Sequence, residues 1–274
     1  MSMEGLQAAA APAVGDWIAP RLRGDFGAVC RTVPRGYPAY ARILHPVEPD
    51  AGDQAGPTTW AGVCARTGRT PHALMQWEAI TTPAPPPRSG REVVLSREGR
   101  WDEVQVRRGI LLPQALSPLL DVLAPFTGEQ DCHHALWEGW GWLTGGSAFL
   151  TFSSAGGPQS PAPTRAATPD VLEQALNASR LSLPGREYLL FTGPLHAALG
   201  MGDQVTDDWF DPQSPNLLWP ADRSWCLATE IDFDSTLIAG PVDLIDAVLA
   251  APALEAWPVH EDDDLSAFAD HLNT

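Results

Sequence analysis

The sequence contains no lysine, and all 17 of its basic residues are arginine. A GC-rich genome accounts for this bias, because its codons favour arginine, alanine and proline over lysine. The absence excludes every mechanism that depends on a lysine amine. No residue can form a Schiff base with a carbonyl substrate or hold a nucleotide phosphate as a P-loop lysine does.

Cysteine is scarce, and the four thiols, Cys30, Cys64, Cys132 and Cys226, include no Cys-x-x-Cys pair. Zinc ribbons and thioredoxin-like redox sites need such pairs. The first residues lack the basic segment of a signal peptide, and no apolar run reaches the ~20 residues of a membrane span. We therefore expect reduced thiols, a cytoplasmic location and no contact with membranes.

Familiar catalytic motifs are also missing. The seven histidines are scattered and form no His-Glu-x-x-His motif, and no Gly-x-Ser-x-Gly elbow is present. The formal net charge is −17, which repels phosphate backbones and argues against nucleic-acid binding. The charge instead suits a basic protein partner or a cation.

What is present indicates a folded protein, because 44% of the 274 residues are hydrophobic and only 19% are charged. Strands and helices alternate irregularly, which predicts an α+β fold with mixed or antiparallel sheets and flanking helices. Strands are expected at 33–44, 91–95, 104–106, 133–142, 148–152, 188–192 and 224–234. Helices are expected at 113–123, 168–179, 195–199, 240–249 and 262–272.

The domain organisation follows from two loose, proline-rich segments at 82–90 and 153–167. We expect a loosely ordered arm over 1–30, an N-terminal α+β region over 31–152 and a C-terminal α+β region over 168–274. One continuous domain is the alternative. Thr32-Val33-Pro34 and Ser182-Leu183-Pro184 are similar, and each is followed by a tyrosine. This short similarity leaves open the possibility that the chain consists of two related halves.

The segment 224–234 has the alternation of a strand. Its bulky residues fall on one face, and Glu230, Asp232 and Asp234 fall on the other, at a spacing of roughly 7 Å. Such a row suits a divalent metal or forms an acidic surface for a cationic partner. The alternative is the solvated face of a half-exposed strand, with Arg186 and Arg223 as counter-charges.

Tryptophan is abundant, with 11 residues, and two regions suggest a binding surface. Trp140 and Trp142 lie among glycines, which favours a stacking surface for a sugar, a base or a cationic group, although core packing is the alternative. The segment 203–222 combines carboxylates with aromatic rings and favours a lid or a partner contact, with a plain surface crossover as the alternative. Its candidate binding residues are Asp207, Asp208, Trp209 and Trp219.

Three strings carry a resemblance: CHHALWEGWGWL from Cys132, LPGREYLLFTGPL from Leu183, and SPNLLWPADRSWCLATEIDFDSTLIAG from Ser214. The chain resembles, over roughly its last half and more weakly over 34–46, a family of proteins from high-GC bacteria with no assigned function. The resemblance implies that 215–234 is a shared structural element. It implies no activity, and the family has aromatic residues where this chain has His133 and His134.

Two functions remain open. The first is a binding protein of an immunity-like or regulatory kind, whose acidic, tryptophan-rich surface recognises a basic partner. The alternative is a divalent-metal-dependent hydrolase or phosphoryl-transfer enzyme that uses Glu230, Asp232 and Asp234. The sequence decides neither whether the protein is an enzyme nor its oligomeric state.

Overall fold

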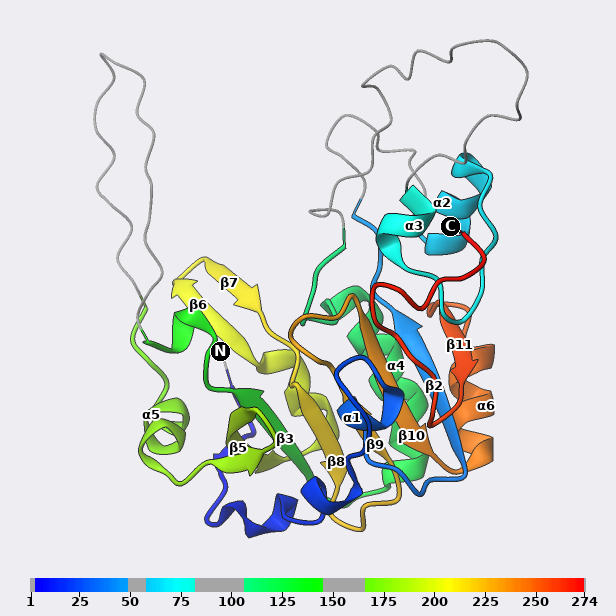
Figure 1. Ribbon diagram of the computed structural model, residues 1–274. Coiled ribbons are helices and arrows are strands. Elements are labelled where there is room, and N and C mark those ends of the chain that lie inside the picture. The colour runs from blue at the N-terminus through cyan, green and yellow to red at the C-terminus, as the bar shows by residue number, and fades with distance from the viewer. Residues whose placement is uncertain (1–2, 49–57, 82–105, 145–165, 274) are drawn as a thin grey trace, which may run out of the picture.

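The computed structural model describes residues 3–48, 58–81, 106–144 and 166–273 (Figure 1). Within these residues the strands form one large sheet and one separate two-stranded hairpin. Every strand pair in them is antiparallel. The predicted α+β class, with antiparallel sheets and flanking helices, is confirmed.

The large sheet has nine strands in the described residues. Their order is β1 (Gln7–Ala8), β5 (Arg186–Gly193), β3 (Cys132–Trp137), β8 (Leu217–Pro220), β9 (Cys226–Ala228), β10 (Ser235–Gly240), β2 (Ala39–Leu44) and β11 (Ala256–Val259), with β4 (Leu181–Leu183) beside β5. Strand β3 lies between β5 and β8, and β2 lies between β10 and β11. The regions 31–152 and 168–274 therefore share one sheet.

The centre of the sheet is buried on both faces. All six residues of β10 are buried. Because side chains alternate along a strand, Ile238 packs into the cluster beneath the helices, whereas Leu237 packs into the cluster on the opposite face. Each such buried aliphatic side chain stabilises the fold by about 1.5–3 kcal/mol.

Helices cover one face of this sheet (Figure 1). They are α4 (Pro113–Thr127), α6 (Val242–Ala250) and the 3-10 helix η5 (Leu195–Gly200). Helix α4 starts with a proline at its first position, where no backbone N–H is needed, and its four leucines Leu116, Leu119, Leu120 and Leu123 are all buried. The helices predicted over 113–123, 195–199 and 240–249 are confirmed, with ends shifted by a few residues.

The opposite face is covered by the N-terminal segment and by the chain that follows β11. The N-terminal segment contains η1 (Pro12–Gly15), η2 (Ala19–Arg21) and α1 (Val29–Thr32), and Ile18 and Val29 are fully buried in its contact with the sheet. Strand β1 adds to the sheet edge through β5. A loosely ordered arm over 1–30 is therefore wrong for the described residues from 3 onward, because single apolar residues anchor this segment.

Smaller clusters lie at the two ends of the sheet. Helices α2 (Trp60–Thr67) and α3 (Trp77–Thr81) enclose the buried Trp60, Met75 and Ile80 near the end of β2. We call residues 59–81 the small helical lobe. At the other end, α5 (Asp170–Asn177) packs Leu172 against the sheet beside η4 (Gly141–Thr144). Helix α5 confirms the helix predicted at 168–179.

Several predicted elements differ from the structure. Strand β3 ends at Trp137 instead of 142, because the chain turns at the following Glu138-Gly139. The segment 203–222 contains β6 (Gly202–Thr206), β7 (Trp209–Pro212) and β8 instead of a plain loop. The helix predicted over 262–272 is wrong, because this tail forms turns. The strands predicted at 91–95 and 148–152, and most of the loose segments at 82–90 and 153–167, lie outside the described residues.

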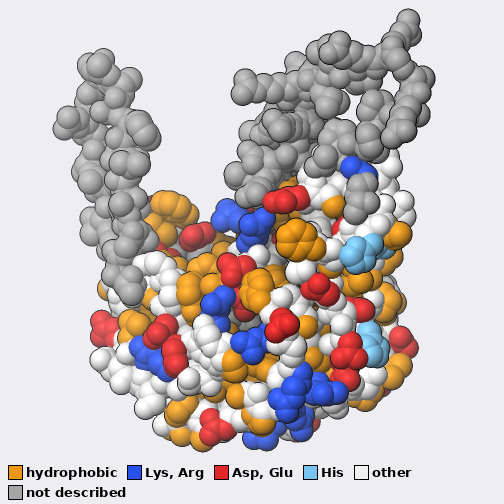
Figure 2. Space-filling model, in the orientation of Figure 1, with side chains coloured by type: hydrophobic (Ala, Val, Ile, Leu, Met, Phe, Trp, Pro, Cys, Tyr) orange, Lys and Arg blue, Asp and Glu red, His pale blue; other side chains and the backbone are white. Residues whose placement is uncertain are grey.

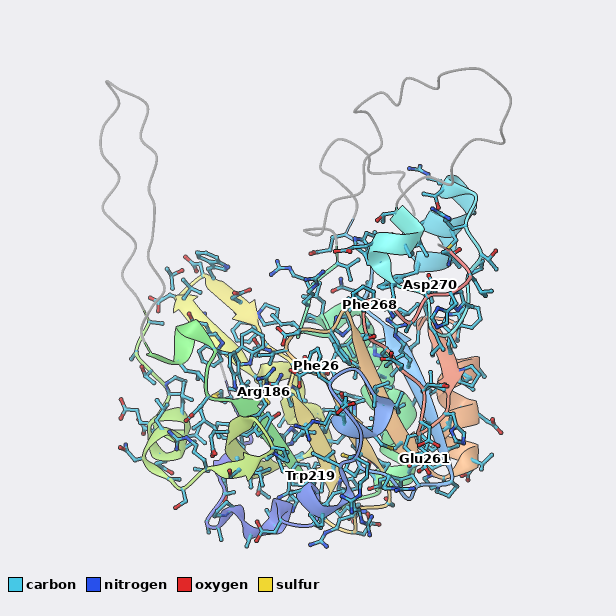
Figure 3. All side chains as sticks on the ribbon, viewed as in Figure 1. Phe26, Arg186, Trp219, Glu261, Phe268 and Asp270 are labelled. Atoms are coloured by element: carbon cyan, nitrogen blue, oxygen red, sulfur yellow. The ribbon has the colours of Figure 1, made fainter. Side chains whose placement is uncertain are left out.

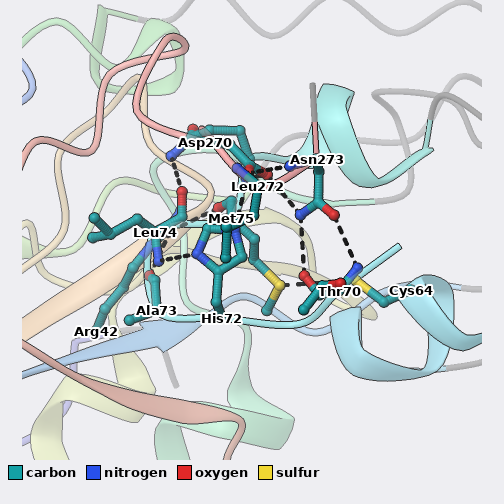
Figure 4. Close-up of polar contacts among 11 residues, drawn as sticks. Arg42, Cys64, Thr70, His72, Ala73, Leu74, Met75, Asp270, Leu272 and Asn273 are labelled. Atoms are coloured by element: carbon teal, nitrogen blue, oxygen red, sulfur yellow. Dashed lines mark hydrogen bonds and ion pairs between the residues drawn. The ribbon is translucent and has the colours of Figure 1, made fainter. Parts of the chain in front are cut away.

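The C-terminal tail is held by one buried carboxylate (Figure 4). Asp270 is 4% exposed and accepts hydrogen bonds from His72 Nε2 at 2.9 Å, from the backbone N–H of Gln76 at 3.2 Å and from Asn273. Asn273 in turn bonds the backbone N–H and carbonyl of Thr70. These contacts fix the tail to the small helical lobe, from which it is distant in the sequence.

Replacing this carboxylate tests the role of the tail. Burial raises the Asp270 pKa, but hydrogen bonds from Asn273, His72 and Gln76 outweigh that effect and lower it. The stabilisation is therefore present above pH 4 and is lost as the pH falls through the lowered pKa. We expect Asp270→Ala to lower the free energy of unfolding by about 2–3 kcal/mol at pH 7, measured by urea denaturation.

The difference between wild type and D270A should shrink as the pH falls well below 4. The exposed Asp262 provides the control, since its side chain is 84% accessible and D262A should leave the unfolding curve unchanged. A difference that stayed constant from pH 7 to strongly acidic pH would contradict the assignment.

Candidate functional site

The predicted strand at 224–234 is wrong as a continuous element. Strand β9 ends at Ala228, the chain turns at Ile231 and Asp232, and β10 begins at Ser235. Because Ala228 pairs with Leu237, the two strands form a hairpin. Glu230, Asp232 and Asp234 therefore lie on its connecting turn and not on one face of a strand.

Two of these three carboxylates bind one arginine. Arg186 Nη2 donates to Glu230 Oε1 at 2.7 Å and to Asp232 Oδ2 at 3.1 Å, and its guanidinium lies 5.8 Å from the ring centroid of Trp137. Burial lowers the Arg186 pKa, but the hydrogen bond and charge of Glu230 outweigh it, so that pKa is raised. The counter-charge prediction for Arg186 is confirmed.

The third carboxylate, Asp234, points to a different arginine. Arg42 Nη2 donates to Asp234 Oδ1 at 3.4 Å, and the Arg42 side chain is 1% exposed. Arg42 also donates to Ser235 Oγ at 2.9 Å and to the carbonyl of Met75 at 2.8 Å. Burial raises the Asp234 pKa, and the charges of Arg42 and Arg108 oppose that rise. Asp234 is therefore part of a buried structural pair.

The proposed metal row is thus divided between two arginines. A hard cation needs several oxygen ligands that converge on one point. Among the residues that the structure describes, no group of three histidine, cysteine, aspartate or glutamate side chains has the geometry of a metal site. The geometric basis of the metal hypothesis was a single strand with all three acids on one face, and the hairpin removes it.

The cysteines and the buried histidines do not have the environment of catalytic groups. Burial raises the pKa of Cys30 and Cys64 to about 11 and that of Cys132 to about 12. A nucleophilic thiol needs a lowered pKa, so these three stay protonated at neutral pH. Burial also lowers the pKa of His45 and His134 to about 4, so both rings are neutral at pH 7.

The predicted tryptophans separate into buried and surface groups. Trp219 is fully buried, 6.2 Å from Trp17 between ring centroids, so its assignment to an exposed binding surface is wrong. Trp140 is half-buried and donates through Nε1 to Asn216 Oδ1 at 3.0 Å. Because Asn216 also accepts from the backbone N–H of Trp137, Trp140 belongs to a packed polar contact under the turn.

The remaining predicted residues meet at one edge of the molecule, on the β6–β7 hairpin (Figure 1). Asp207 and Asp208 form its exposed turn, and Trp209, at the start of β7, is 53% exposed. A cleft of about 80 Å³ at the base of the hairpin is lined by Trp142, Leu143, 166–169, Leu172, Leu176 and Gly202-Asp203-Gln204. We call Trp142, Asp203 and the hairpin residues Asp207, Asp208, Trp209 and Asp211 the acidic edge.

Two exposed phenylalanines were not predicted from the sequence. Phe26 is 59% exposed and packs edge-to-face on Phe233 with ring centroids 5.6 Å apart, and Phe268 is 86% exposed. Figure 3 shows both rings on the face that also carries Arg186. No periodic pattern marks either residue, because both lie in irregular segments.

The contact of Arg42 with Asp234 and the contacts of Arg186 with Glu230 and Asp232 should differ strongly in their effect on stability. We expect Arg42→Met to lower the free energy of unfolding by about 3–5 kcal/mol, because it removes the closest partner of Asp234 and the donor to Ser235 Oγ and to two backbone carbonyls. Arg186→Met should cost only about 1 kcal/mol, because its side chain is 26% exposed and solvent can replace it. Chemical denaturation at pH 7 measures both, and equal losses would argue against the buried pair.

The hairpin geometry also predicts how divalent metals act. Because Arg186 already occupies an oxygen of both Glu230 and Asp232, millimolar Mg²⁺ or Mn²⁺ should change the melting temperature of wild type and of E230Q/D232N by the same amount. A ligand that binds only the folded state must raise that temperature by mass action. A metal-dependent rise in wild type that the variant loses would restore the metal site.

No helix in the described part of the chain is long and apolar enough to cross a bilayer. The resemblance to proteins of high-GC bacteria stays a prediction. No protein-family model, curated protein or solved structure matches the chain, so the acidic edge and the two arginine pairs are interpreted from their own chemistry.

Proposed function

We propose that this protein is a binding protein whose acidic edge recognises a basic protein partner. The observation that carries the proposal is the exposed Trp209 set among exposed carboxylates, next to a cleft that combines apolar walls with an acid. An immunity-like or regulatory role, in which the protein neutralises or controls a basic partner, fits this chemistry.

The hairpin supplies the chemistry that cationic side chains prefer. Asp207, Asp208 and Asp211 are exposed and carry three negative charges on ten residues of chain from Gly202. An indole is the strongest aromatic partner for a guanidinium or ammonium group, and Trp209 is more than half exposed beside these charges. Figure 2 shows hydrophobic and acidic side chains together where this hairpin lies.

The cleft at the base of the hairpin suits one long basic side chain. Trp142, Leu172 and Leu176 give it apolar walls, and Asp203 lies among its lining residues. Arginine and lysine bury an aliphatic stem while their charged end stays near polar groups. A cleft with this lining therefore accommodates the aliphatic stem of a single arginine or lysine from the partner, and the exposed carboxylates of the hairpin attract its charged end.

The net charge of −17 extends the attraction beyond the contact itself. Charged surfaces of opposite sign raise the association rate of protein partners, and the effect weakens with salt. The first turn of α5 adds Asp170 and Glu173 near the same edge, and both are exposed. Long-range steering and local contact thus favour the same class of partner.

A charge-reduced hairpin tests the proposal. We expect D207N/D208N to weaken binding of a fluorescent oligo-arginine peptide about threefold to tenfold, because each removed surface ion pair contributes a few tenths to 1 kcal/mol. W209A should weaken it further through loss of the cation–π contact. Fluorescence anisotropy at low and high salt measures both effects.

The double variant D246N/E129Q is the matched control, because it removes the same charge from exposed positions outside the acidic edge. Its affinity for the peptide should stay close to wild type. Pull-downs from native extract with wild type and the two double variants extend the test to natural partners. Equal weakening of peptide binding by both double variants would show that only total charge matters and would contradict the proposed site.

A further inference from the structure

The β6–β7 hairpin has one edge that no other strand of the described residues covers. In that part of the chain β7 pairs with β6 alone, and the hairpin is separate from the large sheet (Figure 1). The outer side of β6 is partly occupied, because the backbone N–H of Ala166 donates to the carbonyl of Val205 at 3.3 Å. The edge left open is therefore that of β7, which carries Trp209 and Asp211 of the acidic edge.

The register of the hairpin shows which backbone groups face this edge. The backbone N–H of Gln213 donates to the carbonyl of Met201 at 2.9 Å, so these two residues form a hydrogen-bonded pair of the ladder. In an antiparallel ladder such pairs alternate with pairs whose N–H and C=O groups point away from the partner strand. By this count Phe210 and Pro212 belong to the outward-pointing pairs. Phe210 therefore directs both a donor and an acceptor toward the open edge, and Pro212 directs an acceptor.

The side chains of β7 alternate between solvent and the protein. Trp209 and Asp211 are exposed, whereas Phe210 and Pro212 are half-buried. A strand placed beside β7 would bring two of its residues, two positions apart, directly opposite Trp209 and Asp211, with Cβ atoms about 4.5–5.5 Å apart. The indole attracts a cation over its face, and the carboxylate attracts one by charge. The edge therefore suits an extended segment that has basic residues at alternate positions.

Charge decides which strand this edge accepts. A second copy of the chain would bring Asp207, Asp208 and Asp211 of both molecules together, and like charges across a strand pair destabilise it. Charged residues and proline on an edge strand are means by which proteins prevent pairing with their own copies. A basic segment has the opposite sign, so the carboxylates that oppose self-pairing favour its addition.

We propose that the basic partner binds by strand addition, with an extended segment of alternating arginine or lysine residues pairing antiparallel to β7. The inference rests on the function proposed for the acidic edge and adds to it the mode of binding and the sequence pattern of the partner. Backbone hydrogen bonds to Phe210 fix the position of the segment, and its alternate basic side chains contact Trp209 and Asp211. The residues between the basic ones lie opposite Phe210 and supply these backbone groups.

The test uses short fluorescent peptides in which arginine alternates with threonine, and the full chain. N-methylation of the threonines removes the N–H groups that would bond Phe210, and it should weaken binding about tenfold in fluorescence anisotropy. N-methylation of the arginines is the matched control, because their N–H groups face away from β7, and this peptide should bind like the parent. A peptide of the same composition with its arginines in one block should bind several-fold more weakly than the alternating one.

Amide hydrogen exchange reports on the edge directly. The alternating peptide should slow exchange of the Phe210 N–H more than that of the Asp211 N–H, which already faces β6. Equal binding of the two N-methylated peptides, or unchanged exchange at Phe210, would overturn strand addition, while weaker binding to D207N/D208N would still support the acidic edge. Absence of binding by every peptide would contradict both proposals. Protection of Phe210 that grows with protein concentration without peptide would assign the edge to a second copy and overturn the inference.

Discussion

The fully buried Arg42 is the group around which the structure is organised. Its guanidinium joins β2 to the β9–β10 turn through Asp234 and Ser235, and it joins both to the small helical lobe through the carbonyls of Ala73 and Met75. A charge removed from water is tolerable only when its donors are satisfied together. The lobe, the turn and the sheet therefore have to be in place at once, and the tail held by Asp270 closes the same region.

The same turn explains why the alternating pattern of 224–234 predicted one continuous strand where the structure has a hairpin. Alternation of bulky and acidic residues predicts a strand, but it carries no information on where a hairpin reverses. What decides the reversal is distant in sequence: Arg186 holds Glu230 and Asp232 on one side, and Arg42 holds Asp234 on the other. A separation of acids between two arginines lies beyond any local pattern, whereas the counter-charge role of Arg186 was visible from charge alone.

Elements with strong local signals were predicted well. Helix α4 has a leucine stripe and a proline start, and α5 follows a threonine-proline-aspartate start, so both follow from the sequence. The N-terminal segment has no such period, and only isolated residues such as Ile18 hold it to the sheet. Among the candidate binding residues, Asp207, Asp208 and Trp209 are adjacent in sequence, and the structure places all three on the exposed end of the β6–β7 hairpin.

Net charge and local charge govern different events in this protein. At physiological salt the Debye length is about 8 Å, so an approaching molecule senses the total charge only weakly until it is close to the surface. The acidic excess then selects partners by sign during approach, while contact is decided by whichever groups lie within a few ångströms. A chain of net charge −17 can for that reason carry exposed arginines such as Arg21 and Arg223 within a surface that has an excess of carboxylates. The arrangement of charges, and not their sum, defines what the surface can bind.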